Sequence, residues 1–198
     1  DRVDLIYANA ADTARLVREK GIAPLVAPAG LADEAMVVVP AGSAVTAVPD
    51  FRPGVRVAAT EAPDVEMICR MLLEPADLRP DDLVVSVRKS YVLVAKALFS
   101  GEADAGFFLA ESFDQLAAMT REQLRPVIRS RISVVRHSLL AGPRVTESHR
   151  EALLTALLEM TANPSDKRLL EDLGLGDGWA RMTREDAERM IDLMCALG

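Results

Sequence analysis

A strand–helix–strand–helix–strand pattern in the middle of the chain constrains the fold more than any other feature. Three short runs read as strands: VRVAAT from Val55, LVVSVR from Leu83 and ADAGFFLA from Ala103. The apolar periodicity between them predicts helices over residues 64–73 and 91–98. Strands that alternate with helices form parallel sheets with covered faces. We therefore expect the three strands to be parallel neighbours in one sheet, with both helices packed on it.

Further elements are predicted on either side of this pattern. Residues 3–7 read as a strand that leads into a helix ended by Gly21, and APLVAP and DEAMVVVP read as two more strands. The β-branched stretch over residues 124–142 reads as one extended crossing segment or as two strands. After it, the sequence predicts helices over residues 147–160, at PSDKRLLEDLGLG and after Thr183.

The charge balance argues against nucleic acid as a partner. Lys and Arg number 23 against 30 Asp and Glu, which gives a net charge of −7. Phosphate neutralisation needs clustered cations, and only residues 88–89 and 129–136 are locally basic in this acidic chain. The content of 50% hydrophobic and 27% charged residues is ordinary for a globular protein. No apolar run approaches the roughly 18 residues that a transmembrane helix needs.

The cysteines and histidines are interpreted as structural residues. Cys69 and Cys195 lie far apart, lack metal-ligand spacing and fall on apolar helix faces, so we expect two buried free thiols rather than a disulfide. His137, in the crossing segment, and His149, at a helix start, are expected to be structural or surface residues. The sequence also lacks a nucleophile elbow, a Walker-type glycine loop and a paired-histidine motif. We therefore expect no metal site, no cofactor and no enzymatic activity.

The order of the segments resembles the phosphate, phosphite and phosphonate type of ABC-transporter substrate-binding protein. The matching stretches are VDLIYANAADTARLV, DEAMVVVP, VRVAAT, VAKALFSGEADAGFFLAESFDQL, LRPVIRSRI and LLTALLEMTANPSDKRLLEDLGL. The most specific is AKALFSGEADAG, a helix that ends in a glycine turn and feeds a buried strand. These stretches run in the family's order over nearly the whole chain, and it is this shared order that carries the resemblance.

The resemblance implies a two-lobed α/β fold of the type II periplasmic binding protein kind, with mostly parallel sheets covered by helices. Residues 1–45 would form part of lobe 1, residues 54–122 lobe 2, and residues 123–198 a crossing segment back to lobe 1 with the C-terminal helices. The family usually has another strand–helix–strand–helix ahead of VDLIYA, so lobe 1 is expected to be incomplete in this sequence. The hinge would lie in the crossings near residues 41–53 and 124–140.

The implied function is the capture of a small solute for an ABC-type uptake system. The ligand would be phosphonate-like or another small polar, anionic or zwitterionic compound, and the partner would be an ABC permease. The location would be periplasmic or otherwise extracytoplasmic. Two alternatives stay open on the residues alone: a ligand-sensing domain in the cytoplasm and, less favoured, an enzyme on the same fold.

Ligands of open α/β sheets bind beyond the carboxyl ends of the strands. We expect the polar and aromatic side chains at those ends to line one common pocket. They are Tyr7, Asn9, Thr60, Glu61, Lys89, Ser90, Tyr91 and Glu111. The start of the second central helix is the better anion site, because Arg88 and Lys89 supply positive charge there. Ser90 is also a good N-cap for that helix, and Phe107 and Phe108 are expected to be core residues.

The loop before the first central helix, TEAPD from Thr60 to Asp64, is acidic where the family usually has Gly, Ser and Thr. An ionised carboxylate about 5 Å from a phosphonate costs roughly 3 kcal/mol at an effective dielectric constant of 20. A helix N-terminus offers at most about 2 kcal/mol in return. We therefore expect Asp64 to act as the N-cap or first-turn acid of its own helix, and Glu61 to meet the cationic end of a zwitterion. The sequence predicts weak or no binding of inorganic phosphate.

Overall fold

The computed structural model describes residues 3–197, which divide into two compact units. Unit 2 is the continuous stretch Asp33–Ile132, and unit 1 combines the residues before it with Ser133–Ala196. The two-lobed α/β class is confirmed. The sequence places residues up to 45 in lobe 1, whereas residues 33–45 lie in unit 2. The reason is that the strand they contain pairs on both sides with strands of the unit 2 sheet.

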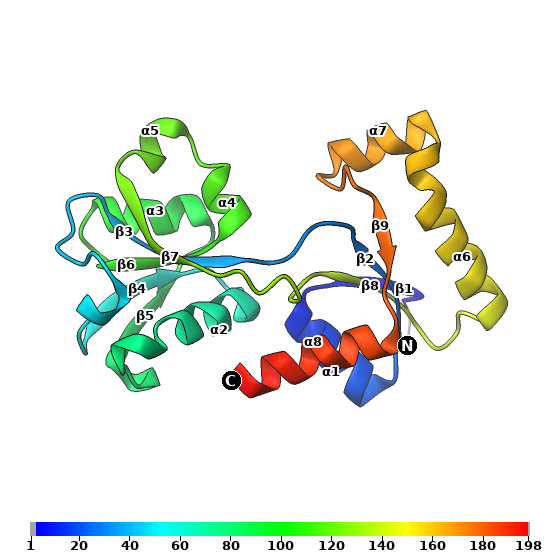
Figure 1. Ribbon diagram of the computed structural model, residues 1–198, viewed down its shortest axis with the longest axis horizontal. Helices are drawn as coiled ribbons and strands as arrows, with labels where there is room; N and C mark the ends of the chain where they lie inside the picture. Colours follow the sequence, from blue (N-terminus) through cyan, green and yellow to red (C-terminus); the bar gives the residue numbers. More distant parts are fainter. Residues whose placement is uncertain (1–2, 198) are drawn as a thin grey trace. The chain divides into compact units, whose positions relative to one another are not determined.

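Unit 2 is built on a five-stranded sheet with the strand order β5-β4-β6-β3-β7 (Figure 1). Its strands are β3 (Ala35–Pro40), β4 (Val55–Ala59), β5 (Leu83–Val87), β6 (Ala105–Leu109) and β7 (Leu124–Arg129). Its helices are α2 (Pro63–Leu72), α3 (Tyr91–Phe99), α4 (Ala110–Asp114) and α5 (Ala118–Arg121), with 3₁₀ turns at Val48–Asp50, Glu74–Ala76 and Pro80–Asp82.

Strand β4 pairs in parallel with β5 and with β6, which confirms the predicted arrangement of the three central strands. Strand β3 pairs antiparallel with β6 and with β7, so the sheet is mixed rather than mostly parallel. The physical reason is that β3 and β7 carry the chain into and out of the unit and are not parts of a strand–helix–strand repeat. Helices α2 and α3 cover opposite faces of the sheet (Figure 1).

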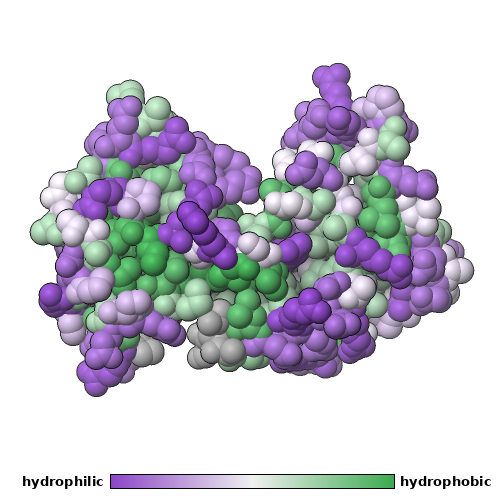
Figure 2. Space-filling model, viewed as in Figure 1, coloured by the Kyte–Doolittle hydropathy of each residue, from purple (hydrophilic) through white to green (hydrophobic). Residues whose placement is uncertain are grey.

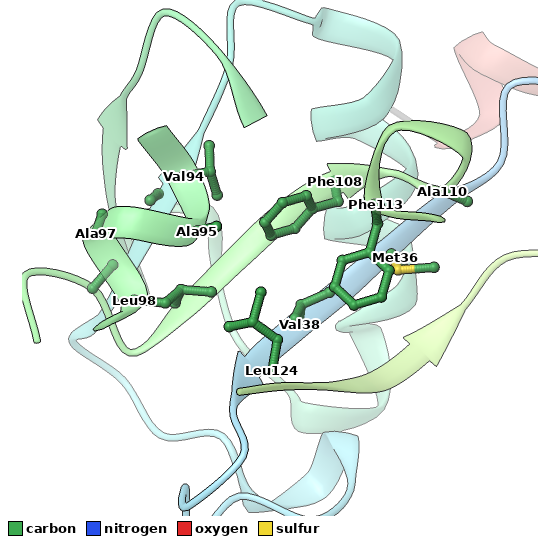
Figure 3. Close-up of a cluster of buried hydrophobic side chains, with 12 residues drawn as sticks. Met36, Val38, Val94, Ala95, Ala97, Leu98, Phe108, Ala110, Phe113 and Leu124 are labelled. Atoms are coloured by element: carbon green, nitrogen blue, oxygen red, sulfur yellow. The ribbon is translucent and has the colours of Figure 1, made fainter. Parts of the chain in front are cut away.

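The core under α3 is centred on Phe108. Its side chain is fully buried, and its ring meets that of Phe113 edge to face, with centroids 5.5 Å apart (Figure 3). Val94 and Leu98 of α3 belong to the same cluster, as does Met36 of β3. This packing follows from the strand period, because alternate residues of each strand face α3. Phe107, on the other face of the sheet, is fully buried too, so both phenylalanines are core residues as predicted.

The glycines of the AKALFSGEADAG motif have separate structural roles. Gly101 ends α3 in a left-handed conformation, with φ +69°, which a glycine adopts without strain. Gly106 lies in β6, where an added Cβ would come within 2.8 Å of the Phe108 ring and 2.9 Å of Val94. The motif therefore combines a helix stop with a close approach of α3 to the sheet.

Unit 1 is built on a four-stranded sheet with the order β1-β8-β2-β9. Its strands are β1 (Leu5–Ala8), β2 (Ala23–Pro28), β8 (Ser138–Ala141) and β9 (Trp179–Arg181). Its helices are α1 (Ala10–Lys20), α6 (Glu147–Glu159), α7 (Pro164–Asp172) and α8 (Arg184–Leu197), with a 3₁₀ turn at Met160–Ala162. All three strand pairings are antiparallel, so the expectation of a mostly parallel sheet is wrong here. Strands β8 and β9 come from the later part of the chain and insert beside β2 in the opposite direction.

Helices pack on this sheet through apolar faces and fix their ends with local caps. Leu154 of α6 is buried in a cluster with Leu25 and Val26 of β2. At the start of α8, the Thr183 N–H donates to the Asp186 carboxylate and the Asp186 N–H donates to the Thr183 hydroxyl. This exchange is a reciprocal capping arrangement, with aspartate in place of the usual glutamate, at the helix start that the sequence predicts after Thr183.

A carboxylate joins the two segments through which the chain enters and leaves unit 2. Glu34 accepts hydrogen bonds from the Ser130 hydroxyl and, at 3.0 Å, from the Ile132 N–H. The Ser130 hydroxyl in turn accepts from the Ala35 N–H at 2.9 Å. The chain passes between the units at Ala32–Asp33 and Ile132–Ser133. The second boundary falls inside the predicted crossing, whereas the first lies ahead of the predicted range 41–53.

The two cysteines are both free, but only one is buried. Cys69 of α2 has no exposed surface, and burial strongly raises the pKa of its thiol. Cys195 of α8 is exposed, and an Arg18 N–H lies 3.4 Å from its sulfur. The prediction of two buried thiols is therefore wrong for Cys195, because the exposed face of α8 reaches that position.

We expect a thiol reagent to modify Cys195 rapidly and Cys69 only when the protein unfolds, because a thiolate and access are both needed for reaction. Titration with an aromatic disulfide reagent should release one equivalent at once in native buffer and two in denaturant. A Cys195→Ser variant should release none in native buffer. Equal reaction rates for the two thiols in the native protein would contradict the burial of Cys69.

Candidate functional site

Three strand ends meet at one edge of the unit 2 sheet and bring most of the predicted site residues together. Because β5, β4 and β6 are parallel neighbours, their carboxyl ends lie at the same edge. Thr60 directly follows β4, Ser90 and Tyr91 follow β5, and Glu111 follows β6. This edge is the candidate ligand site of unit 2.

The start of α3 is capped by Ser90, as predicted. The Ser90 hydroxyl accepts from the Leu93 N–H at 3.4 Å, and the Ser90 carbonyl accepts from the same N–H at 3.0 Å. The first-turn N–H groups of Tyr91 and Val92 have no carbonyl partner within the helix. A nine-residue helix of this kind places its positive dipole end at the sheet edge, which favours a negative group there.

Tyr91 links this helix start to the other two strands. Its ring stacks on Phe108, with centroids 5.7 Å apart and an angle of 26° between the planes. Its hydroxyl is hydrogen-bonded to the Thr60 side chain and to the Leu109 backbone. Burial, with a smaller contribution from the negative charge of Asp64, raises the pKa of the Tyr91 phenol, while those two hydrogen bonds act in the opposite direction. The phenol is therefore neutral and a hydrogen-bond donor at physiological pH.

The start of α2 differs from the start of α3. Its N-cap is Ala62, whose side chain makes no capping bond, and Pro63 is the first helical residue. Asp64 is therefore not the N-cap, and that part of the prediction is wrong. It lies in the first turn, as the alternative prediction had it, and is only 4% exposed. The proline shifts the helix start by one residue, because its fixed φ suits the first helical position.

The remaining predicted residues of unit 2 are charged and lie at the surface. Glu61 and Lys89 are both exposed, and Glu111 accepts from the Gln115 amide at 3.0 Å. Arg88, which the sequence suggested as a second cation of the site, pairs with Glu102 at 3.1 Å. Lys89 is therefore the better candidate for attracting an anion to the start of α3.

Unit 1 holds the other two predicted residues, Tyr7 and Asn9. The Asn9 side chain caps α1 by accepting from the Asp12 N–H at 2.7 Å, a role that the sequence analysis did not assign. The Tyr7 ring is half exposed and stacks on His137, with centroids 5.3 Å apart. It also meets Trp179 edge to face at 6.1 Å. This aromatic cluster lies at the carboxyl end of β1.

Sequence reasoning missed His137 and Trp179 as companions of Tyr7. They are separated from it by most of the chain, and only the antiparallel register brings them together. Ser138 pairs with Ala8, and Trp179 pairs with Pro28 at the end of β2. The chain has a single tryptophan, which was the one available signal. That the unit 1 and unit 2 residues line one common pocket stays a prediction.

Residues 3–197 contain no group of three or more His, Cys, Asp or Glu side chains arranged to hold a metal ion. Within the same range, each helix is either too short or too polar to cross a membrane.

The fold is that of the type II periplasmic binding proteins. Residues 1–187 match the family model described as ABC transporter, phosphonate, periplasmic substrate-binding protein. The chain belongs to this family. Members of the family are substrate-binding proteins of transport systems, with a small anionic ligand and a permease as partner. A search of curated proteins found no match.

Solved structures agree with this assignment at the level of the fold. A chloride-bound protein from Xanthomonas citri has a TM-score of 0.78 at 16% identity, over 99% of this chain and 77% of that one. A binding protein component of an ABC phosphonate transporter from Pseudomonas aeruginosa has a TM-score of 0.72 at 15% identity, over 100% and 72%. A methylphosphonate complex from Prochlorococcus marinus has a TM-score of 0.75 at 11% identity, over 98% and 78%.

Proposed function

We propose that this protein captures a small zwitterionic phosphonate-like compound outside the cytoplasm and delivers it to an ABC-type permease. The observation that carries the proposal is the neutral Tyr91 phenol at the start of α3. The Leu109 backbone N–H can only donate, so it occupies one lone pair of the phenol oxygen. The Thr60 hydroxyl can accept or donate in this pair, so the phenol proton can be offered to an acceptor-rich ligand when Thr60 donates.

The chemistry around Tyr91 supports an anionic group at this position. The first-turn N–H groups of α3 and the exposed Lys89 supply positive potential. The hydrogen-bonded hydroxyl pair of Thr60 and Tyr91 supplies one further donor without adding charge. A phosphonate or sulfonate group, with three acceptor oxygens, suits such a set of donors better than an apolar group.

The acids at the start of α2 support a second, cationic group on the ligand. Asp64 is close enough to Tyr91 for its charge to raise the pKa of the phenol. Its carboxylate, together with that of Glu61, opposes a ligand that carries only negative charge. An ammonium group on the same ligand removes this penalty. A compound such as 2-aminoethylphosphonate therefore fits the site better than inorganic phosphate does.

Calorimetry with inorganic phosphate, methylphosphonate and 2-aminoethylphosphonate tests the proposal. We expect the aminophosphonate to bind most tightly and phosphate weakly or not at all. Replacing both acids with neutral isosteres, Glu61→Gln and Asp64→Asn, should strengthen methylphosphonate binding at least about tenfold, or about 1.4 kcal/mol. The same double variant should weaken binding of the aminophosphonate.

A matched control is Glu66→Gln, because Glu66 lies on the same helix but pairs with Arg70 at 2.8 Å. This change should leave the order of the three ligands unchanged. Micromolar binding of inorganic phosphate by the unmutated chain would overturn the proposed selectivity. Heat signals indistinguishable from buffer for phosphonates, sulfonates and their amino derivatives would overturn the proposed ligand class.

A further inference from the structure

Strand β5 is an outer strand of the unit 2 sheet without the usual protection against pairing. Its five residues, LVVSV, contain no charge and no proline, and the Val84 and Val87 side chains are each 56% exposed. The other outer strand, β7, carries Arg125, Pro126 and Arg129 and has a register shift against β3. Charges, prolines and irregularities are the devices by which proteins prevent edge pairing. Unit 2 therefore protects one edge of its sheet and leaves the other open.

The backbone of β5 presents a regular row of outward donors and acceptors. The Arg88 N–H donates to the Ala59 carbonyl, and the Asp82 carbonyl accepts from the Gly54 N–H. The backbone groups of the even-numbered residues therefore face inward, and those of Leu83, Val85 and Val87 face away from the sheet. Figure 2 shows hydrophobic surface on unit 2 around the strands that Figure 1 labels β4, β5 and β6.

The residues that flank β5 make the strand complementary to itself. Asp81 and Asp82 precede it, and Arg88 and Lys89 follow it. In an antiparallel pair of two such strands, centred on Val85, the outward-facing residues lie opposite one another. The acidic start of each copy then meets the basic end of the other, with the exposed Asp81 opposite the exposed Lys89. Asp82 and Arg88 also lie opposite each other, but they pair within their own copy with Arg79 and Glu102.

We infer that β5 pairs antiparallel with β5 of a second copy of this chain, which forms a two-fold dimer with a sheet continuous through both copies. A two-fold interface uses the same patch on each subunit, so it requires the self-complementarity that β5 and its flanks provide. Strand β1 of unit 1 is also an outer strand but lacks such flanks. No basic residue follows it directly, because Asn9 and Ala10 come next in the chain.

Sedimentation equilibrium over a wide range of protein concentration tests this inference. The mass of the unmutated chain should rise from 21.4 kDa towards twice that value. Val85→Pro removes a backbone donor that faces outward, a place where edge strands tolerate proline, and should weaken the dimer at least about tenfold. Circular dichroism should show that this variant keeps the native fold.

A charge exchange supplies a second test that does not alter the backbone. Asp81→Lys places like charges opposite each other and should weaken the dimer several-fold, as should Lys89→Asp. The double variant Asp81→Lys, Lys89→Asp restores opposite charges and should recover the dimer. Added salt should reduce these differences, because exposed ion pairs are screened. A chain that stays at 21.4 kDa at all concentrations would overturn the inference, as would a dimer whose affinity is unchanged in Val85→Pro, Asp81→Lys and Lys89→Asp.

Discussion

Replacing Phe108 with alanine is expected to destabilise unit 2 by about 3–5 kcal/mol. The ring is fully buried and meets two other aromatic rings, those of Tyr91 and Phe113. Its removal loses apolar burial and leaves a cavity between α3 and the sheet. Urea unfolding followed by far-ultraviolet circular dichroism should show a lower midpoint for the unit 2 transition.

Phe99→Ala is the matched control, because Phe99 is the same residue type on α3 but is 43% exposed. This change should cost less than about 1 kcal/mol, as surface substitutions usually do. Similar losses for the two variants would contradict the position of Phe108 at the centre of the core. Hydrogen exchange of the β6 amides would locate the loss, since those amides should open more readily in Phe108→Ala alone.

Replacing Tyr91 with phenylalanine is expected to lower the affinity for the aminophosphonate by roughly 10- to 100-fold. The loss corresponds to one hydrogen bond to a charged group, about 1.5–3 kcal/mol. The phenylalanine ring keeps the stacking on Phe108, so the variant should stay folded, although loss of the hydrogen bonds to Thr60 and Leu109 also lowers the unfolding free energy. Calorimetry and urea unfolding on the same preparation separate the two quantities.

Unchanged affinity in Tyr91→Phe would mean that the phenol serves only the hydrogen bonds to Thr60 and Leu109. Tyr91→Ala alone cannot make this distinction, because it also removes the ring that covers Phe108. The phenylalanine variant is therefore the informative one.

The parts of the fold that follow from local periodicity were predictable. The three parallel strands and their two helices each have a period of apolar residues that can be recognised within the segment alone. Ser90 caps α3, as its residue type suggests. The antiparallel pairings were not predictable, because they depend on which distant segment lies beside β2 or β3. Strand β9 has only three residues, too few for a strand period to appear.

The candidate site shows the same division between local and distant information. The end of each central strand could be read from the sequence, and so could the polar residues that follow it. The burial of Asp64 and the partners of Tyr91 could not, because both depend on side chains from neighbouring strands. Asn9 illustrates a different limit, since a good cap and a good ligand contact call for the same residue type.

The position of the single tryptophan gives the protein an internal optical probe. Trp179 belongs to unit 1 and lies beside Tyr7, whereas unit 2 contains no tryptophan. Tryptophan emission therefore follows the aromatic cluster of unit 1, while circular dichroism follows the helices of both units. A ligand that quenches or shifts this emission would report contact with the Tyr7 cluster without any label. Unfolding curves from the two signals would diverge wherever the units lose their structure at different denaturant concentrations.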